Sequence, residues 1–124
     1  MNKYIMVIDD SPTIRVSVEM ALKQLGLPIK QAENRQDALE KIGQIKGEGS
    51  EIAICISDIN MPVLNGLEFI TEFRKVDKFT PVVVLTTEAE KDVIQKGKEA
   101  GASGWIIKPF QAEDLLNVVK RFVK

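Results

Sequence analysis

The sequence predicts an α/β fold in which a five-stranded, mostly parallel sheet lies between two layers of helices. Short runs rich in Ile and Val recur along the chain, without the apolar–polar alternation of a strand that has one face in water. Segments with a helical period of apolar residues separate these runs. A chain of 124 residues, 44% of them hydrophobic, has the size of one domain with one core. We therefore expect a single three-layer, doubly wound domain over residues 1–124.

Five segments are expected to form the strands. Four are continuous apolar runs, and the second in chain order is weaker. The expected strands are 3–8, 28–32, 52–57, 81–85 and 104–107. Because crossovers between parallel strands are right-handed, the helices that connect these strands are expected to cover both faces of the sheet.

The first two helices have clear sequence boundaries. Ser11 is a good N-cap, Pro12 fits the first helical turn and Gly26 stops the helix. Asn34 caps the second helix, which ends near Gly47. The apolar faces of these helices are expected at Ile14, Val18, Leu22 and Leu25, and at Ala38, Leu39, Ile42 and Ile45.

The remaining three helices are expected before, between and after the last two strands. Thr87 and Glu90 form a capping box for the fourth helix, which Gly101 closes. The third helix is marked by Leu67, Ile70 and Phe73, and the fifth by Ala112, Leu115, Leu116, Val119 and Phe122.

Composition excludes several classes of function. Seventeen basic and eighteen acidic residues give a formal charge of −1, so we expect neither a nucleic-acid partner nor insertion into a membrane. The N-terminal apolar run is too short for a signal peptide or a membrane span, which predicts a cytoplasmic protein. Cys55 is the only cysteine and lies in an apolar run, so it is expected to be a buried, inert thiol.

Polar side chains stand at the C-terminal ends of four predicted strands. In a doubly wound sheet, ligands bind outside these strand ends, where the strand order reverses. The residues are Asp9 and Asp10 after the first strand, Asp58 after the third, Thr86 and Thr87 after the fourth, and Lys108 after the fifth. We therefore expect them to converge on one patch.

Each of these residues alone is more typical of a turn, a helix start or a strand end than of a functional site. Together, three carboxylates and one ammonium leave an excess of negative charge that a divalent cation can offset. Oxygen ligands without His or Cys favour Mg²⁺. A carboxylate beside a metal, a lysine and a hydroxyl can also accept a phosphoryl group as an aspartyl phosphate.

Four motifs resemble those of a known family. The segments "VIDD", "SDINMPVLNG", "VVVLTTE" and "GASGWIIKPF" look like the receiver domain of two-component response regulators, and the resemblance extends over the whole chain. Within that family the chain most resembles the single-domain chemotaxis regulators. The resemblance implies a flavodoxin-like fold with strand order 2-1-3-4-5.

The same resemblance assigns roles to the residues at the strand ends. Asp58 would be the phosphoacceptor, with Asp10 and the backbone carbonyl of Asn60 beside it on Mg²⁺ and Asp9 holding the metal through water. Lys108 would pair with the phosphoryl group, before a cis Pro109.

Two further residues match the family's switch positions. Thr86 would be the switch hydroxyl, and Trp105 occupies the place of the aromatic switch residue. A partly buried core aromatic is an equally good interpretation of Trp105. Thr87 would flank the entrance to the phosphate, where its methyl group could restrict attacking water.

The resemblance implies a signalling switch, not an enzyme with turnover; it would catalyse only its own phosphorylation and slow autodephosphorylation. A sensor histidine kinase would be its partner, with a flagellar motor switch protein or a phosphatase as further partners of a monomer. The output surface would carry Lys91, Lys96, Lys98, Lys120 and Arg121, which suit an acidic partner. A phosphorelay shuttle or a phosphate sink would use the same site.

Two alternatives come from other classes of protein. A flavodoxin-type binder shares the fold, but Asp9 and Asp10 would repel a phosphate in its first loop. A haloacid-dehalogenase-type phosphatase places its nucleophile after the first strand in a D-x-D pattern, whereas the two acids here are adjacent.

Overall fold

The computed structural model of the protein describes residues 3–59, 66–87 and 91–123. Its sheet has the order β2-β1-β3-β4-β5, and every pair of neighbouring strands is parallel. The strands are β1 (Lys3–Ile8), β2 (Ile29–Ala32), β3 (Glu51–Asp58), β4 (Val82–Thr86) and β5 (Gly104–Ile107). The predicted fold class and strand order are therefore confirmed, with strand boundaries within one residue of the expected ones.

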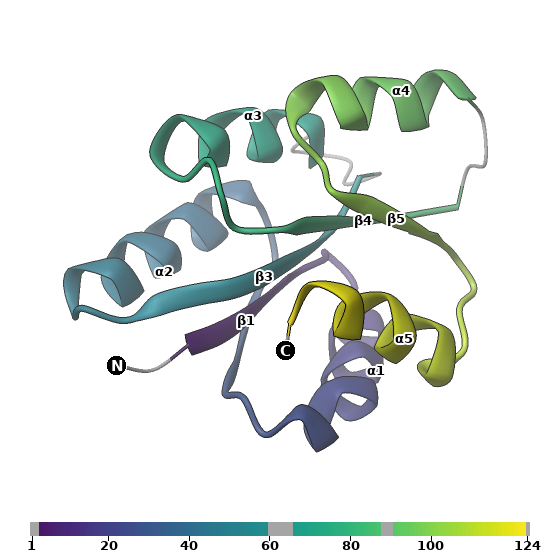
Figure 1. Ribbon diagram of the computed structural model, residues 1–124, viewed down its shortest axis with the longest axis horizontal. Helices are drawn as coiled ribbons and strands as arrows, with labels where there is room; N and C mark the ends of the chain where they lie inside the picture. Colours follow the sequence, from purple (N-terminus) through teal and green to yellow (C-terminus); the bar gives the residue numbers. More distant parts are fainter. Residues whose placement is uncertain (1–2, 60–65, 88–90, 124) are drawn as a thin grey trace.

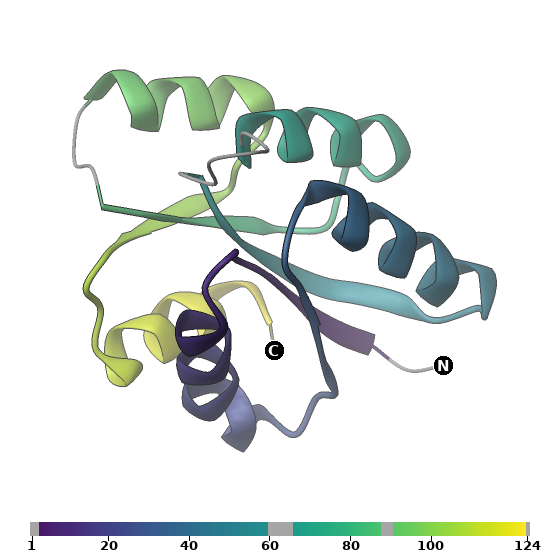
Figure 2. The same cartoon turned by 180° about the vertical axis from the view of Figure 1, so that it is seen from behind.

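Helices cover both faces of the sheet. They are α1 (Pro12–Leu22), a 3₁₀ turn η1 (Lys23–Leu25), α2 (Arg35–Gly47), α3 (Gly66–Val76), α4 (Lys91–Ala100) and α5 (Ala112–Phe122). Figure 1 shows α1 and α5 on one face and α2, α3 and α4 on the other, and the reverse view in Figure 2 agrees. The arrangement is the expected three-layer sandwich.

The two faces of β1 explain why its apolar run is unbroken. Ile5 and Val7 pack with buried residues of α1 and α5, whereas Met6 and Ile8 pack with those of α2 and α3. All four side chains are fully buried. Since neither face meets water, the strand has no position for a polar residue until it ends at Asp9.

Local sequence signals place several helix ends. The Oγ of Ser11 accepts a hydrogen bond from the amide of Ile14 at 3.4 Å, and Oδ1 of Asn34 accepts one from Asp37 at 2.8 Å. Gly26 follows η1 in the left-handed region, at φ 74°. The first helix differs from prediction because its last turn tightens to 3₁₀ before that glycine. The predicted capping box of α4 includes Glu90, which lies outside the described residues.

A polar turn closes the amino end of the sheet after α3. Asp77 accepts hydrogen bonds from Nζ of Lys46 at 2.8 Å and from the hydroxyl of Thr80 at 2.6 Å. The amides of Phe79 and Thr80 donate to the same carboxylate at 3.0 and 2.9 Å. Burial by itself would raise the pKa of Asp77, but these hydrogen bonds outweigh it and hold that pKa well below its ordinary value.

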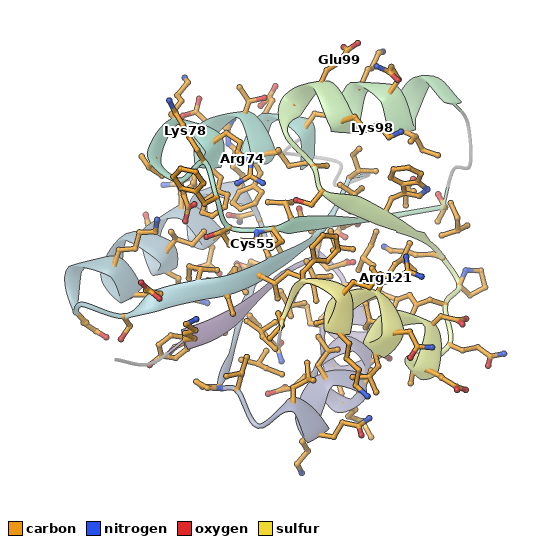
Figure 3. The ribbon with its side chains drawn as sticks, in the orientation of Figure 1. Cys55, Arg74, Lys78, Lys98, Glu99 and Arg121 are labelled. Atoms are coloured by element: carbon orange, nitrogen blue, oxygen red, sulfur yellow. The ribbon has the colours of Figure 1, made fainter. Side chains whose placement is uncertain are left out.

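Two further features bear on the predictions from composition. Cys55 is a buried free thiol in β3, and burial raises its pKa far above the ordinary value, so it is chemically inert as expected. Figure 3 shows it among the side chains at the centre of the sheet. In the portion of the chain that the structure describes, none of the helices has the length and apolar character required to span a bilayer.

Candidate functional site

The carboxyl ends of β1 and β3 bring three acids together. These strands are neighbours, and Ile8 lies opposite Ser57 in the parallel register, so Asp9 and Asp58 reach the same edge. One carboxylate oxygen from each of Asp9, Asp10 and Asp58 lies within 4.8 Å of the others. This edge lies where the strand order reverses between β1 and β3, which is where the sequence predicted a site.

Lys108 directly follows β5, the edge strand two places from β3, and its side chain extends back to the acids. Its Nζ lies 3.1 Å from Oδ2 of Asp9 and 3.3 Å from Oδ2 of Asp58, and its side chain is only 14% exposed. The peptide between Lys108 and Pro109 is cis, as the family resemblance implied. One ammonium is thus shared between two carboxylates.

Asp9 and Asp10 have different surroundings although they are adjacent. Asp9 is fully buried, and its Oδ1 accepts a hydrogen bond from the amide of Ser11 at 2.9 Å. Burial raises the pKa of Asp9 above its ordinary value, reinforced by the charge of Asp58, and the hydrogen bonds from Ser11 and Lys108 only partly offset this. Asp10 is exposed, and no described residue donates a hydrogen bond to its carboxylate.

The acid cluster fits Mg²⁺. All of its donors are oxygens, and they lie within 4.8 Å of one another, close to the separation of about 4.2 Å between oxygens on opposite sides of an octahedral Mg²⁺. A cation would also offset the mutual repulsion of the carboxylates, which Lys108 alone does not balance. Asn60, whose carbonyl the sequence added to this set, lies outside the described residues.

Thr86 and Trp105 line the same small hollow, together with Ile59, which follows Asp58 in the chain. Thr86 ends β4 and is buried, whereas Trp105 in β5 is 38% exposed. The hollow lies between these strands and α4, and Ile94 and Gly97 also contribute to its lining. Space next to the Trp105 ring therefore leads toward the Thr86 side chain.

One basic side chain lies over the exposed ring of Trp105. Nζ of Lys98 lies 4.8 Å from the centre of the ring, a cation–π contact. In Figure 3, Lys98 on α4 and Arg121 on α5 lie on either side of β5. Lys96 and Lys120 are exposed as well, whereas nothing is described of the side chain of Lys91.

The sequence prediction did not include Arg15 and Gln31. Nη1 of Arg15 donates to the carbonyl oxygen of Asp9 at 2.6 Å, and its Nε donates to Oε1 of Gln31 at 3.2 Å. An arginine one helical turn after the N-cap Ser11, together with a polar residue in the weak second strand, was the available signal. These residues form a polar support behind the acid cluster.

Comparison with known proteins agrees with this geometry. The family model of the response regulator receiver domain matches residues 5–120. The chemotaxis protein CheY4 of Vibrio cholerae has a similar solved structure, with a TM-score of 0.89 at 36% identity, covering 99% of this chain and 100% of that one. Receiver domains are signalling proteins, not metabolic enzymes.

Two curated relatives are longer than this chain. The sensor histidine kinase CheAY of Helicobacter pylori is 36% identical over 97% of this chain, which spans only 15% of that protein. The transcriptional regulatory protein PrrA of Mycobacterium tuberculosis is 31% identical, and the chain spans 49% of it. The matched family, the shared fold and the acids at the reversal point show that this chain belongs to the response regulator receiver domain family, the CheY-like domains of two-component signalling.

Proposed function

We propose that the protein, as a single receiver domain over residues 1–124, is a phosphorylation-dependent switch in a chemotaxis-type two-component pathway. Asp58 accepts a phosphoryl group from a sensor histidine kinase, and the modified protein changes its partner binding. The observation that carries this proposal is the grouping of Asp9, Asp10 and Asp58 within 4.8 Å, with Lys108 shared between two of them. A purely structural role would leave no reason to concentrate like charges there.

The chemistry needs no general base, because the Asp58 carboxylate is already a nucleophile. One of its oxygens forms a bond to phosphorus while the P–N bond of the phosphohistidine breaks, and the leaving imidazole keeps the electron pair and takes a proton from solvent. Lys108 lies 3.3 Å from Asp58 and donates to the oxygens of the transferred group. Asp10, Asp58 and the Asn60 carbonyl would hold Mg²⁺ directly and Asp9 would hold it through water; the bound ion would add positive charge for these oxygens.

The switch uses the hollow between Thr86 and Trp105. A phosphoryl group on Asp58 offers acceptor oxygens that draw in the Thr86 hydroxyl, and this movement leaves space for the Trp105 ring. Inward and outward positions of the ring form a two-state equilibrium that phosphorylation biases. The position of Trp105 at the mouth of a hollow that Thr86 also lines supports this route.

The output surface is the exposed face of α4, β5 and α5. Its basic residues Lys96, Lys98, Lys120 and Arg121 suit an acidic segment of a partner. A flagellar motor switch protein is the partner that a chemotaxis regulator would address, and a phosphatase would reset the switch. We propose that the protein acts as a monomer and has no turnover of phosphomonoesters.

The first experiment tests the acceptor. Asp58→Asn is expected to abolish labelling by acetyl phosphate in the presence of Mg²⁺, because an amide is a poor nucleophile, whereas wild type is labelled. Intact-protein mass spectrometry measures the label. Asp114→Asn, which changes an exposed acid on α5, is the matched control and keeps full labelling. Full labelling of the Asp58 variant would place the acceptor on another residue.

A further inference from the structure

The backbone of Asp9 is held on both sides by groups outside the acid cluster, through its own N–H and its own carbonyl. The amide of Asp9 donates to the carbonyl oxygen of Ala32 in β2 at 3.1 Å, and its own carbonyl accepts from Nη1 of Arg15 at 2.6 Å. Because a peptide unit is planar, the bond to that carbonyl also orients the backbone from which the Asp10 side chain departs. Figure 2 shows how α1 starts directly beside the end of β1.

Arg15 is itself fixed by other polar side chains. Its Nε donates to Oε1 of Gln31 at 3.2 Å, and Nε2 of Gln31 donates to Oε2 of Glu19 at 2.7 Å. The carboxylate of Glu19 can accept only, so the Gln31 amide must turn its oxygen toward Arg15. Nζ of Lys41 donates to the backbone carbonyl oxygen of Gln31 at 2.5 Å, and this bond connects α2 to β2. The guanidinium therefore has one preferred position.

We propose that Arg15, fixed by Gln31 and Glu19, is a positioning residue for Mg²⁺ binding at the acid cluster. It does not contact the metal: it holds the Asp9 carbonyl and thereby the direction in which the exposed Asp10 carboxylate points. Partners of this kind, which orient metal ligands without touching the metal, typically change metal affinity by about 10- to 100-fold. This inference rests on the proposed function, because it assumes that the cluster binds Mg²⁺.

The charge of Arg15 and its positioning role have opposite consequences. If the guanidinium acted only as a positive charge near three acids, its removal would make the cluster more negative and Mg²⁺ binding tighter. If it orients the Asp9–Asp10 peptide, its removal allows Asp10 to adopt other directions, and binding becomes weaker. The sign of the change in Mg²⁺ affinity therefore separates the two roles.

Isothermal titration calorimetry of the full chain with MgCl₂ measures the Mg²⁺ affinity and tests the proposal. Arg15→Met is expected to weaken Mg²⁺ binding about tenfold. Gln31→Met leaves the charge of the protein unchanged but removes the side-chain oxygen that accepts from Nε of Arg15. Glu19 then lacks its hydrogen bond from Gln31 and is expected to draw the guanidinium away from the Asp9 carbonyl. This variant should therefore weaken binding in the same direction. Lys23→Met removes an exposed positive charge in η1 and is the matched control, with unchanged affinity.

Urea unfolding in EDTA accompanies each titration, so that loss of folding is not mistaken for loss of affinity. If Arg15→Met does not fold, Arg15→Lys replaces it: one ammonium cannot serve both acceptors, and an intermediate loss of affinity is expected. Unchanged or tighter Mg²⁺ binding by the Arg15 variant, or unchanged binding by the Gln31 variant, would overturn the proposal. Absence of Mg²⁺ binding by wild type would overturn the proposed function as well, and it is seen without any variant.

Discussion

The acids at the two ends of the sheet have surroundings that shift their pKa values in opposite directions. At the amino end, Asp77 receives hydrogen bonds from Lys46, from Thr80 and from two backbone amides, and its pKa lies well below the ordinary value. At the carboxyl end, Asp9 shares one lysine with Asp58, and its pKa is raised. The fold satisfies the first carboxylate completely and leaves the second short of positive charge.

This difference distinguishes a structural acid from a functional one. Asp77 stabilises the turn between α3 and β4, and the protein itself supplies its hydrogen-bond donors, so that it needs no ligand. The acids at the carboxyl end repel one another in the absence of a ligand, so the folded protein holds them at a cost in stability. Such crowding is retained at sites where a ligand restores the balance. The two ends should therefore respond differently to mutation, pH and Mg²⁺.

The largest expected effect is at the amino end. Asp77→Ala removes a carboxylate with an 11% exposed side chain and all of its hydrogen bonds, and should lower the free energy of unfolding by about 2–3 kcal/mol at pH 7. Urea denaturation measures the change. Glu99→Ala, at an exposed acid that points away from the molecule in Figure 3, is the control and should stay within about 0.5 kcal/mol of wild type. A change of only about 0.5 kcal/mol in the Asp77 variant would contradict the structural role of Asp77.

The pH dependence of this variant follows from the lowered pKa of Asp77. A carboxyl whose pKa is lower in the folded than in the unfolded state stabilises the protein above its unfolded pKa, and this contribution is lost as pH falls below it. Wild type should therefore lose its advantage over Asp77→Ala as pH falls from 5 toward 2. A constant difference over that range would show that the carboxylate charge contributes nothing.

Sequence patterns predicted the carboxyl end better than the amino end. Asp9 and Asp58 follow apolar strands directly, so their convergence needs only the parallel order of the strands. The partners of Asp77 and Arg15 are different in kind: Lys46 lies 31 residues from Asp77, and Gln31 lies 16 residues from Arg15. These contacts depend on the reach of long side chains between elements, which periodicity and capping signals do not specify.

The next largest expected effect concerns Asp10 at the carboxyl end of the sheet. Asp10→Ala should be as stable as wild type in EDTA or more so, because it relieves repulsion among the three acids. Mg²⁺ should raise the melting temperature of wild type by mass action, and this rise should largely disappear in the variant. Differential scanning calorimetry with and without Mg²⁺ measures both. A variant clearly less stable in EDTA would make Asp10 a structural residue like Asp77, and the contrast between the two ends would fail.

The smallest expected effect is a change in fluorescence that only the carboxyl end should produce. Trp105 is the only tryptophan, and it shares a hollow with Thr86, the last residue of β4. Mg²⁺ with beryllofluoride, which imitates a phosphoryl group on Asp58, should change its emission as the ring leaves Nζ of Lys98 and moves into the hollow.

Two variants locate the origin of that signal. Thr86→Ala should reduce the response although Asp58 is still occupied, because the hydroxyl that makes room for the ring is missing. Asp77→Ala, measured well below its melting temperature, should keep the full response, because the turn at the amino end contributes stability and no coupling to the site. A full response in the Thr86 variant would exclude its hydroxyl as the link. A response lost in the Asp77 variant would mean that the two ends are coupled, so that the acid at the amino end also takes part in the switch.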